Sequence, residues 1–226
     1  MQKIRVFDPF LFAKNIGISP LQFSDGEIFF AGKIFENYIE IHRNGIVLFE
    51  KELDEKVKNS VERMLPVDST HFIGSDEVGW GNKNEPLIVC AVLMSKQEVV
   101  EYTIKGVMDS KLLGKDEIEK FAGELAHLPH SIITVSPRKK KDIAAPSNEF
   151  LAELHARAIR SLYLRAPPLT QIIIDQFDRK SIYRHFKHMN LLQESNGERY
   201  VPVAAASIIA RSELEKWIKK NRIFAT

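Results

Sequence analysis

Two adjacent carboxylates, Asp76 and Glu77, stand between a short apolar run and two glycines in the stretch HFIGSDEVGWG, which begins at His71. The apolar residues are typical of a buried strand, and Gly79 and Gly81 predict that the strand gives way to a turn. Side chains alternate between the two faces of a strand, so both carboxylates point the same way only if the strand ends before them. Two carboxylates held together need a cation between them, usually a divalent metal. The alternative interpretation is a solvated acidic turn.

A third carboxylate, Asp175, follows the fully apolar, β-branched stretch at 172–174. This stretch predicts a central strand, and ligands of open sheets collect at strand ends. Carboxylates that converge from separate strand ends repel one another unless metal ions or protons intervene. Hydrolysis of a phosphodiester with two metal ions, about 3.5–4 Å apart, needs such an arrangement. Taken alone, Asp175 is better explained as a helix cap or a turn residue.

Composition narrows the class of protein. The chain has 226 residues, of which 44% are hydrophobic and 27% charged, so we expect folded globular structure and not disorder. Its net charge of +2 is not typical of a strongly basic nucleic-acid-binding protein. Any binding of nucleic acid would depend on local patches of positive charge. Cys90 is the single cysteine, which excludes an internal disulfide and fits a reducing compartment. No apolar run is long enough for a membrane span, and the N-terminus lacks the apolar core of a signal peptide, so we expect a cytoplasmic protein.

The elements that must position the carboxylates form two groups. Residues 1–66 predict a small α/β unit, in which Asp8 and Pro9 start a helix and Asn44-Gly45 makes a hairpin. We expect its helices at 8–16 and 53–65 and its strands at 27–35, 38–42 and 45–50. Residues 66–70 read as a linker. In residues 70–226 we expect strands at 71–74, 86–94, 131–136 and 171–174 and helices at 115–126, 147–164, 179–189 and 204–221. Alternating strands and helices predict an α/β fold with a mixed sheet flanked by helices.

Four separated motifs, in this order, resemble those of the type 2 ribonucleases H: IGSDEVGWG at 73–81, DSK at 109–111, IIIDQF at 172–177 and VAAASIIAR at 203–211. The DQF sequence at 175–177 and the small N-terminal unit favour the ribonuclease HIII branch. The stretch NEFLAELHARAI at 148–159 is similar to a helix of that branch. The resemblance implies a ribonuclease H-like fold and a substrate-binding N-terminal domain similar to half of a TATA-box-binding protein. A plain interaction domain is the alternative for this N-terminal unit.

By this resemblance the acidic quartet of the family falls on Asp76, Glu77 and Asp175, with Glu198 as the nearest match for the fourth acid. These four are the expected catalytic and metal-binding residues, and Mg²⁺ or Mn²⁺ is the expected cofactor. Three further acids are reserve candidates for the fourth position: Glu194, Glu213 and Glu215.

The resemblance also implies the substrate, which is the RNA strand of an RNA/DNA hybrid, cleaved to leave a 3′-hydroxyl and a 5′-phosphate. Backbone amides at Gly79 and Gly81 can approach a sugar closely enough to read its 2′-hydroxyl, and Ser110 and Lys111 can hold a phosphate. We expect Asp109 to fix its loop. The turn departs from relatives at Trp80 and at residues 82–86, which affects how the minor groove is placed.

Several readings stay open. The basic run at 138–141 suits either a phosphate backbone or a solvated loop, and His155 is expected to pack within its helix. The leading hypothesis is a monomeric endoribonuclease. The alternatives are a catalytically weak hybrid-binding protein and a nuclease of the same fold that acts on DNA.

Overall fold

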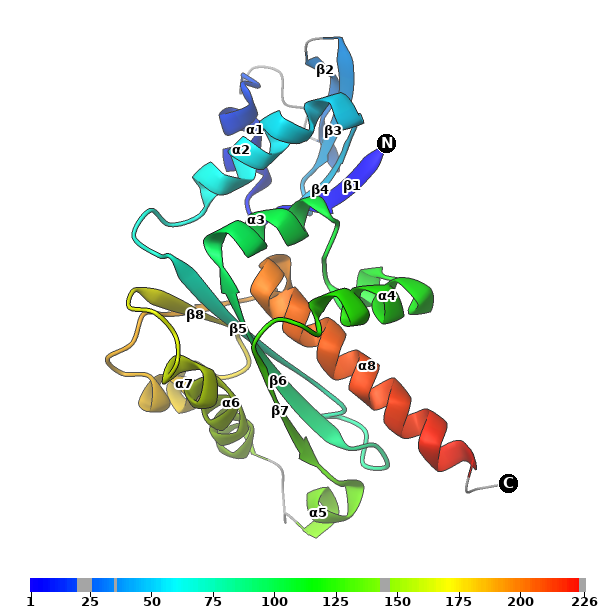
Figure 1. Cartoon of the computed structure of the whole chain (residues 1–226), viewed down its shortest axis with the longest axis vertical. Helices are drawn as coiled ribbons and strands as arrows, with labels where there is room; N and C mark the ends of the chain where they lie inside the picture. The colour runs from blue at the N-terminus through cyan, green and yellow to red at the C-terminus, as the bar shows by residue number, and fades with distance from the viewer. Residues whose placement is uncertain (20–25, 35, 143–146, 224–226) are drawn as a thin grey trace.

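The computed structural model describes residues 1–19, 26–34, 36–142 and 147–223, and arranges them around two sheets (Figure 1). A small four-stranded sheet belongs to the N-terminal part, and a five-stranded sheet forms the centre of the remainder. The expected α/β class is therefore confirmed. Phe35, the last residue of one expected strand, lies outside the described residues.

The N-terminal unit is antiparallel, with strand order β1-β4-β3-β2. Asp8 starts the first helix as expected, because its carboxylate accepts the backbone N–H groups of Phe10 and Leu11 at 3.0 and 2.9 Å. Gly45 takes the positive φ of 89° that the hairpin turn requires. The elements of this unit are β1 (Gln2–Arg5), α1 (Pro9–Ile16), β2 (Ile28–Ile34), β3 (Asn37–His42), β4 (Ile46–Phe49), the 3₁₀ turn η2 (Lys51–Leu53) and α2 (Asp54–Met64).

The larger sheet is mixed, with strand order β7-β6-β5-β8-β9. β5 pairs antiparallel with β6 and parallel with β8, so the pairing changes from antiparallel to parallel at this central strand. Its strands are β5 (His71–Val78), β6 (Leu87–Ser95), β7 (His130–Val135), β8 (Thr170–Asp175) and β9 (Leu191–Glu194). The accompanying helices are α3 (Lys96–Ile104), η3 (Ser110–Leu112), α4 (Lys115–Leu125), α5 (Pro137–Asp142), α6 (Asn148–Tyr163), α7 (Arg179–His185), η4 (Gly197–Arg199) and α8 (Val201–Ile223).

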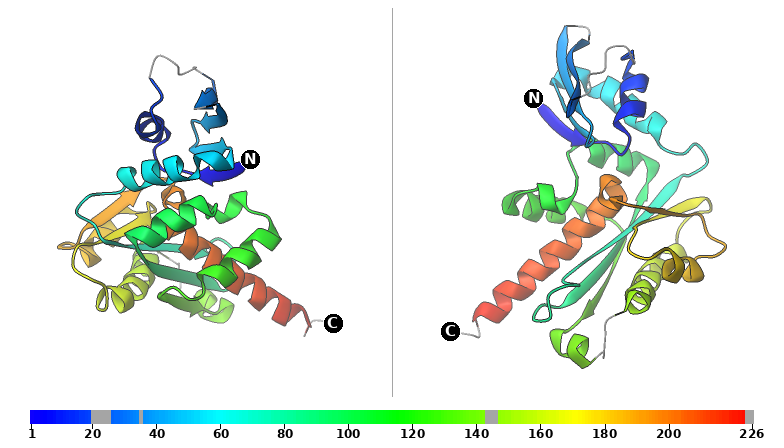
Figure 2. Two further views of the ribbon diagram at one scale, coloured as in Figure 1. Left: turned by 45° about the horizontal axis from the view of Figure 1, so that its top comes forward. Right: turned by 180° about the vertical axis from the view of Figure 1, so that it is seen from behind.

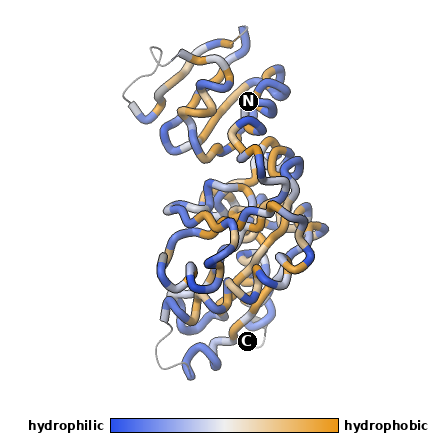
Figure 3. The backbone as a smooth tube through the Cα atoms, turned by 90° about the vertical axis from the view of Figure 1, so that its left-hand side faces the viewer, coloured by the Kyte–Doolittle hydropathy of each residue, from blue (hydrophilic) through white to orange (hydrophobic). Residues whose placement is uncertain are grey.

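The two faces of this sheet are covered by different helices. Along β6, Ile88, Cys90, Val92 and Met94 belong to the hydrophobic cluster that includes α8, while Leu87, Val89, Ala91 and Leu93 belong to the cluster that includes α6. The strict alternation places α8 on one face and α6 on the other. The views from front and back agree, with the sheet between the two helices (Figure 2). The apolar segments run through the interior and the polar ones over the outside (Figure 3).

One glycine lets α8 approach the central strand closely. A Cβ atom on Gly74 would lie 2.0 Å from the carbonyl carbon of Pro202, which is in the first turn of α8. Only glycine avoids this overlap, so the GSDE segment and the VAAAS segment are brought together by direct backbone packing.

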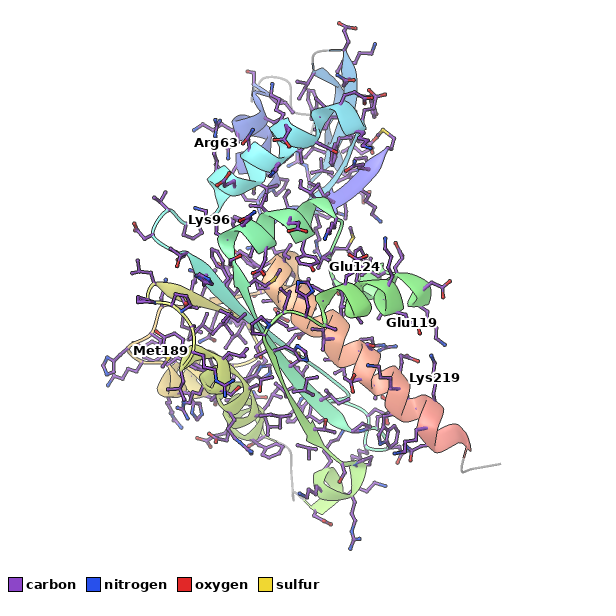
Figure 4. The ribbon with its side chains drawn as sticks, viewed as in Figure 1. Arg63, Lys96, Glu119, Glu124, Met189 and Lys219 are labelled. Atoms are coloured by element: carbon purple, nitrogen blue, oxygen red, sulfur yellow. The ribbon has the colours of Figure 1, made fainter. Side chains whose placement is uncertain are left out.

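The N-terminal unit rests on the larger part of the chain. α2 packs along α3, as the positions of Arg63 and Lys96 illustrate (Figure 4), and α4 packs against α8. An ion pair between Arg5 of β1 and Asp109 spans 3.6 Å, and both side chains are largely buried. Within the described residues, no helix combines the length and apolar character needed to cross a bilayer.

Several expected boundaries were wrong. β5 does not end at Gly74 but continues through both carboxylates to Val78. α3 and the short strands β1 and β9 were not expected, and the basic run at 138–141 forms helix α5. β1 and β9 are four residues long and lie at sheet edges, so neither carries a full alternating pattern.

Candidate active site

Asp76 and Glu77 lie on opposite faces of a paired strand. Asp76 pairs with Cys90 and Glu77 with Val89, so Asp76 faces α8 and Glu77 faces α6. The Asp76 carboxyl group accordingly hydrogen-bonds Ser207 of α8, while Oε2 of Glu77 lies 3.2 Å from Nε2 of His155 on α6. The expectation that the strand ends before these residues, so that both carboxylates point the same way, was therefore wrong.

Asp175 is the last residue of β8. Ser75 pairs with Ile174 in the parallel register, so Asp76 and Asp175 each lie one residue beyond this pair on neighbouring strands. The backbone N–H of Gly197 donates to Oδ1 of Asp175 over 2.7 Å. The site at the end of β8 is thus tied to the short turn η4.

Glu198 follows in η4 and is only 6% exposed. Its Oε1 atom accepts a hydrogen bond of 2.5 Å from Nζ of Lys111. The three reserve acids are engaged elsewhere: Glu194 pairs with Arg199 at 3.0 Å, Glu213 with Lys216 at 2.6 Å and Glu215 with Arg211 at 3.6 Å. Glu198 differs from these three reserve acids because it is buried beside the other carboxylates of the site.

The charges of the four acids act on one another. Burial, followed by the charge of Glu77 and to a lesser degree that of Glu198, raises the pKa of Asp76 to about 8, although the Ser207 hydrogen bond opposes the shift. Burial also raises the pKa of Asp175; the Gly197 N–H opposes this shift, while the charges of Glu198 and Glu77 add to it. Asp76, Glu77, Asp175 and Glu198 therefore form one electrostatically coupled cluster, which we call the acidic quartet.

Each member of the acidic quartet is held by its own donor: Ser207, His155, the Gly197 N–H or Lys111. Over residues 1–19, 26–34, 36–142 and 147–223, no three Asp, Glu, His or Cys side chains are grouped so that they could hold one metal ion as they lie. Lys111 occupies Oε1 of Glu198, so a cation that binds this oxygen must displace the ammonium group.

A family model described as Ribonuclease HII matches residues 73–225 of this chain. The chain belongs to this family. It is 32% identical over 213 residues to ribonuclease HIII of Staphylococcus haemolyticus, covering 79% of this chain and 68% of the relative, and 32% identical over 214 residues to ribonuclease HIII of Geobacillus sp., covering 80% and 70%. The expected type 2 ribonuclease H, of the HIII branch, is confirmed, and the protein is a ribonuclease H enzyme.

Solved structures agree with this assignment. Bst-RNase HIII in complex with Mn²⁺ matches with a TM-score of 0.62 and 25% identity, over 97% of this chain and 82% of the other. The RNase HII of Archaeoglobus fulgidus, solved in a complex with PCNA, matches with a TM-score of 0.56 and 30% identity, over 67% of this chain and 76% of the other. The expected ribonuclease H-like fold is confirmed.

The DSK loop of this ribonuclease H lies beside the acidic quartet. Ser110 Oγ is 2.9 Å from Ser207 Oγ, and Ser207 in turn bonds Asp76. Oδ1 of Asp109 accepts the backbone N–H of Lys111 at 2.9 Å, so Asp109 fixes its own loop. The Glu198 hydrogen bond raises the pKa of Lys111, which keeps the ammonium group charged.

His155 is a site neighbour whose contacts the sequence did not predict. The ring is fully buried, with Nδ1 2.8 Å from Ser75 Oγ and Nε2 3.2 Å from Oε2 of Glu77. Nε2–H donates to the Glu77 carboxylate, which can only accept, while the Ser75 hydroxyl, 2.8 Å from Nδ1, donates to the carbonyl oxygen of Cys90 over 2.9 Å. The only signal in the sequence was its position on the apolar face of a helix, where a polar ring needs partners.

The glycine turn after β5 contains two different glycines. Gly79 has a φ of 81°, and a Cβ atom there would lie 2.0 Å from the carbonyl oxygen of Pro86, so the fold requires glycine. At Gly81 no heavy atom lies within 4 Å of a Cβ position, and φ is not in the left-handed region. The fold leaves the backbone of Gly81 open to approach from outside.

Proposed function

We propose that this ribonuclease H hydrolyses the RNA strand of RNA/DNA hybrids and that the acidic quartet is its catalytic and metal-binding centre. The observation that carries the proposal is geometric: Asp76 and Asp175 lie at matching positions on neighbouring strands, and the buried Glu198 directly follows the residue whose N–H binds Asp175. Buried carboxylates without cations are costly, and a functional site is the common reason for retaining them. The ribonuclease HIII relatives support the reaction class.

The donor set fits a hard divalent cation, either Mg²⁺ or Mn²⁺. Carboxylate oxygens are the ligands that such ions prefer, and added positive charge would offset the burial and the mutual repulsion that raise the pKa of Asp76 and Asp175. Asp76, Glu77 and Asp175 would hold the ions, and Glu198 would join them after releasing Lys111. The Mn²⁺ complex of the structural neighbour Bst-RNase HIII supports this choice.

Two bound ions supply an activated water and stabilisation of the leaving oxygen, and the products would be a 3′-hydroxyl and a 5′-phosphate. The residues of this chain orient the site. Ser207 fixes the Asp76 carboxylate and His155 fixes the Glu77 carboxylate, each by a hydrogen bond. The Gly197 N–H fixes the Asp175 carboxylate in the same way. Lys111, once released by Glu198, has a charged ammonium group beside the site that can bind a phosphate of the cleaved strand.

Substrate contacts are proposed at Gly79, Gly81, Ser110 and Lys111. The open backbone at Gly81 supports close approach of a sugar, whose 2′-hydroxyl distinguishes RNA from DNA. Residues 1–66 would act as a small substrate-binding domain and residues 70–226 as the catalytic domain. Their separate sheets support this division.

A cleavage assay with Asp76→Asn tests the proposal. The substrates are a labelled RNA/DNA hybrid, a DNA duplex and a DNA duplex with one ribonucleotide, each with and without Mg²⁺ or Mn²⁺. We expect metal-dependent cleavage of the hybrid by the wild-type protein, and loss of cleavage with nearly unchanged hybrid binding for Asp76→Asn. Glu119→Gln, an exposed charge on α4 (Figure 4), is the control and should cleave normally. Undiminished cleavage by Asp76→Asn excludes the proposed site.

The second candidate function is a catalytically weak hybrid-binding protein. The occupation of Glu198 by Lys111, and the lack of three grouped ligands among the described residues, favour it. It predicts hybrid binding that weakens steeply with salt but almost no turnover in either metal. Cleavage of the all-DNA duplex would instead indicate a DNA nuclease of the same fold.

A further inference from the structure

Lys140 is a buried lysine within an otherwise exposed basic run. Its neighbours Arg138, Lys139 and Lys141 are exposed, whereas Lys140 is only 4% exposed. Burial lowers the pKa of its ammonium group. A charged side chain is seldom buried unless specific partners bind it.

The partners are three backbone carbonyl groups of the turn between β5 and β6. Nζ of Lys140 lies 2.5 Å from the carbonyl oxygen of Gly79, 2.7 Å from that of Asn82 and 3.1 Å from that of Glu85. These acceptors stand at the beginning, the middle and the end of the 79–85 turn. An ammonium group has three N–H donors, so one side chain satisfies all three carbonyls.

The backbone of Lys140 is anchored close to the end of β7. The backbone N–H of Lys140 donates to the carbonyl of Ser136 over 2.9 Å, and Ser136 directly follows β7. Val135, the last residue of β7, pairs with Leu87, the first residue of β6. Lys140 belongs to α5, the helix that follows β7. Its side chain therefore links the 79–85 turn to the β6–β7 strand pair.

The three hydrogen bonds from Nζ of Lys140, which we call the clamp, also orient the peptide groups of the turn. In a trans peptide the C=O and N–H bonds point in opposite directions, and no peptide bond among the described residues is cis. Binding of the Gly79 carbonyl to Lys140 therefore directs the Trp80 N–H away from the ammonium group. The same argument directs the Lys83 N–H away when Lys140 binds the Asn82 carbonyl.

We propose that Lys140 is a positioning residue whose ammonium group fixes the 79–85 turn, so that the backbone of this turn can read the ribose of the RNA strand. The inference rests on the proposed function. It assigns Lys140 to substrate discrimination through the turn, and not to a phosphate contact as the charge of the run suggests. Loss of the clamp should weaken recognition of the 2′-hydroxyl and leave phosphate contacts unchanged.

Binding in metal-free buffer with EDTA separates the two roles. We expect Lys140→Met to weaken binding of an RNA/DNA hybrid about tenfold and binding of the same sequence as a DNA duplex less than about twofold. Lys139→Met and Lys141→Met, the matched controls in the same run, should change both affinities equally. A hybrid-to-DNA affinity ratio that is the same in Lys140→Met and wild type would overturn the proposal. So would a wild-type protein without any preference for the hybrid.

Hydrogen exchange of the free protein gives an independent readout. Amides of residues 79–85 should exchange about tenfold faster in Lys140→Met, with little change elsewhere. Unchanged exchange in this segment contradicts the clamp. If Lys140→Met does not fold, Lys140→Arg serves instead, because a planar guanidinium group keeps the charge but cannot direct three N–H groups from one nitrogen; it should show the same loss of ratio. Neither the binding measurement nor hydrogen exchange requires cleavage. If the acidic quartet is not the catalytic centre, this will show in the cleavage assay and not in these two experiments.

Discussion

The backbone N–H of Gly197 donates to Oδ1 of Asp175 over 2.7 Å, and a Cβ atom on Gly197 would lie 2.7 Å from Cα of Asp175. The end of β8 and the turn that carries Glu198 are therefore packed backbone against backbone. Two members of the acidic quartet depend on this contact for their relative position.

Gly197→Ala should disturb both members at once. The added methyl group must push η4 away from β8, which we expect to destabilise the protein by about 1–3 kcal/mol and to reduce cleavage at least about tenfold. Gly123→Ala is the control, since a Cβ atom at that helical position meets nothing within 4 Å. It should leave activity unchanged and raise the melting temperature slightly. Equal activity of the two variants would show that η4 is not a fixed part of the site.

The stability of the metal-free protein should fall as the pH rises. Asp76 has a pKa of about 8 in the folded protein against 3.8 in the reference state, so the folded state binds more protons than the unfolded state between these values. Its contribution to stability is complete below about pH 4 and is lost as the pH passes through about 8. Asp76→Asn should remove this dependence and, at pH 8, raise the free energy of unfolding by on the order of 1–2 kcal/mol. Urea unfolding in EDTA at several pH values measures both effects. An identical pH dependence in wild type and Asp76→Asn would contradict the assignment.

Added Mn²⁺ should oppose this loss. Metal binding to a protonated carboxyl group releases the proton, so the stabilisation by Mn²⁺ should be larger at pH 8 than at pH 6 and should be accompanied by proton release. Calorimetric titration in two buffers of different ionisation enthalpy measures the released protons. The result expected for Asp76→Asn is a smaller release.

Lys111→Met should separate metal binding from substrate binding. The ammonium group occupies Glu198 at 2.5 Å, so its removal frees this carboxylate for a cation and should tighten Mn²⁺ binding a few-fold. The side chain of Lys111 is 75% exposed, so the loss of stability should stay below about 1 kcal/mol. Loss of a phosphate contact should raise the KM for the hybrid about tenfold. Lys115→Met, an exposed lysine of α4, is the control. Weaker Mn²⁺ binding by Lys111→Met would mean that Lys111 supports the site and does not compete with the ion.

His155→Ala should lower kcat more than it raises KM. The ring links Ser75 to Glu77 from the interior, and groups that orient metal ligands typically contribute 10–100-fold to activity or metal affinity, so we expect losses of about that size. His155→Gln, which keeps a donor and an acceptor, should restore part of the loss, and His188→Ala, on an exposed histidine, should change nothing. If His155 only fills space in the core, His155→Gln will be no better than His155→Ala at equal stability.

The sequence by itself determined the elements that local chemistry specifies. Asp8 and Pro9 start α1, the Asn44-Gly45 turn joins β3 to β4, and the apolar runs at 86–94 and 171–174 form strands of the central sheet. These features depend on neighbours in the chain, such as a cap, a turn or a run of β-branched residues, and so they can be read without the fold. The order of the four motifs likewise sufficed to place the chain in its family.

Only the tertiary structure decided how β5 carries its acids and how the turn after it is held. Asp76 and Glu77 remain within a strand because they pair with Cys90 and Val89 of β6, and Ser207 and His155 then reach them from helices on opposite faces. Lys140 is buried because three carbonyl groups some 60 residues earlier in the chain converge on it. Burial of a charge is stabilised by partners distant in sequence, and no local pattern around a carboxylate or a lysine encodes whether those partners arrive.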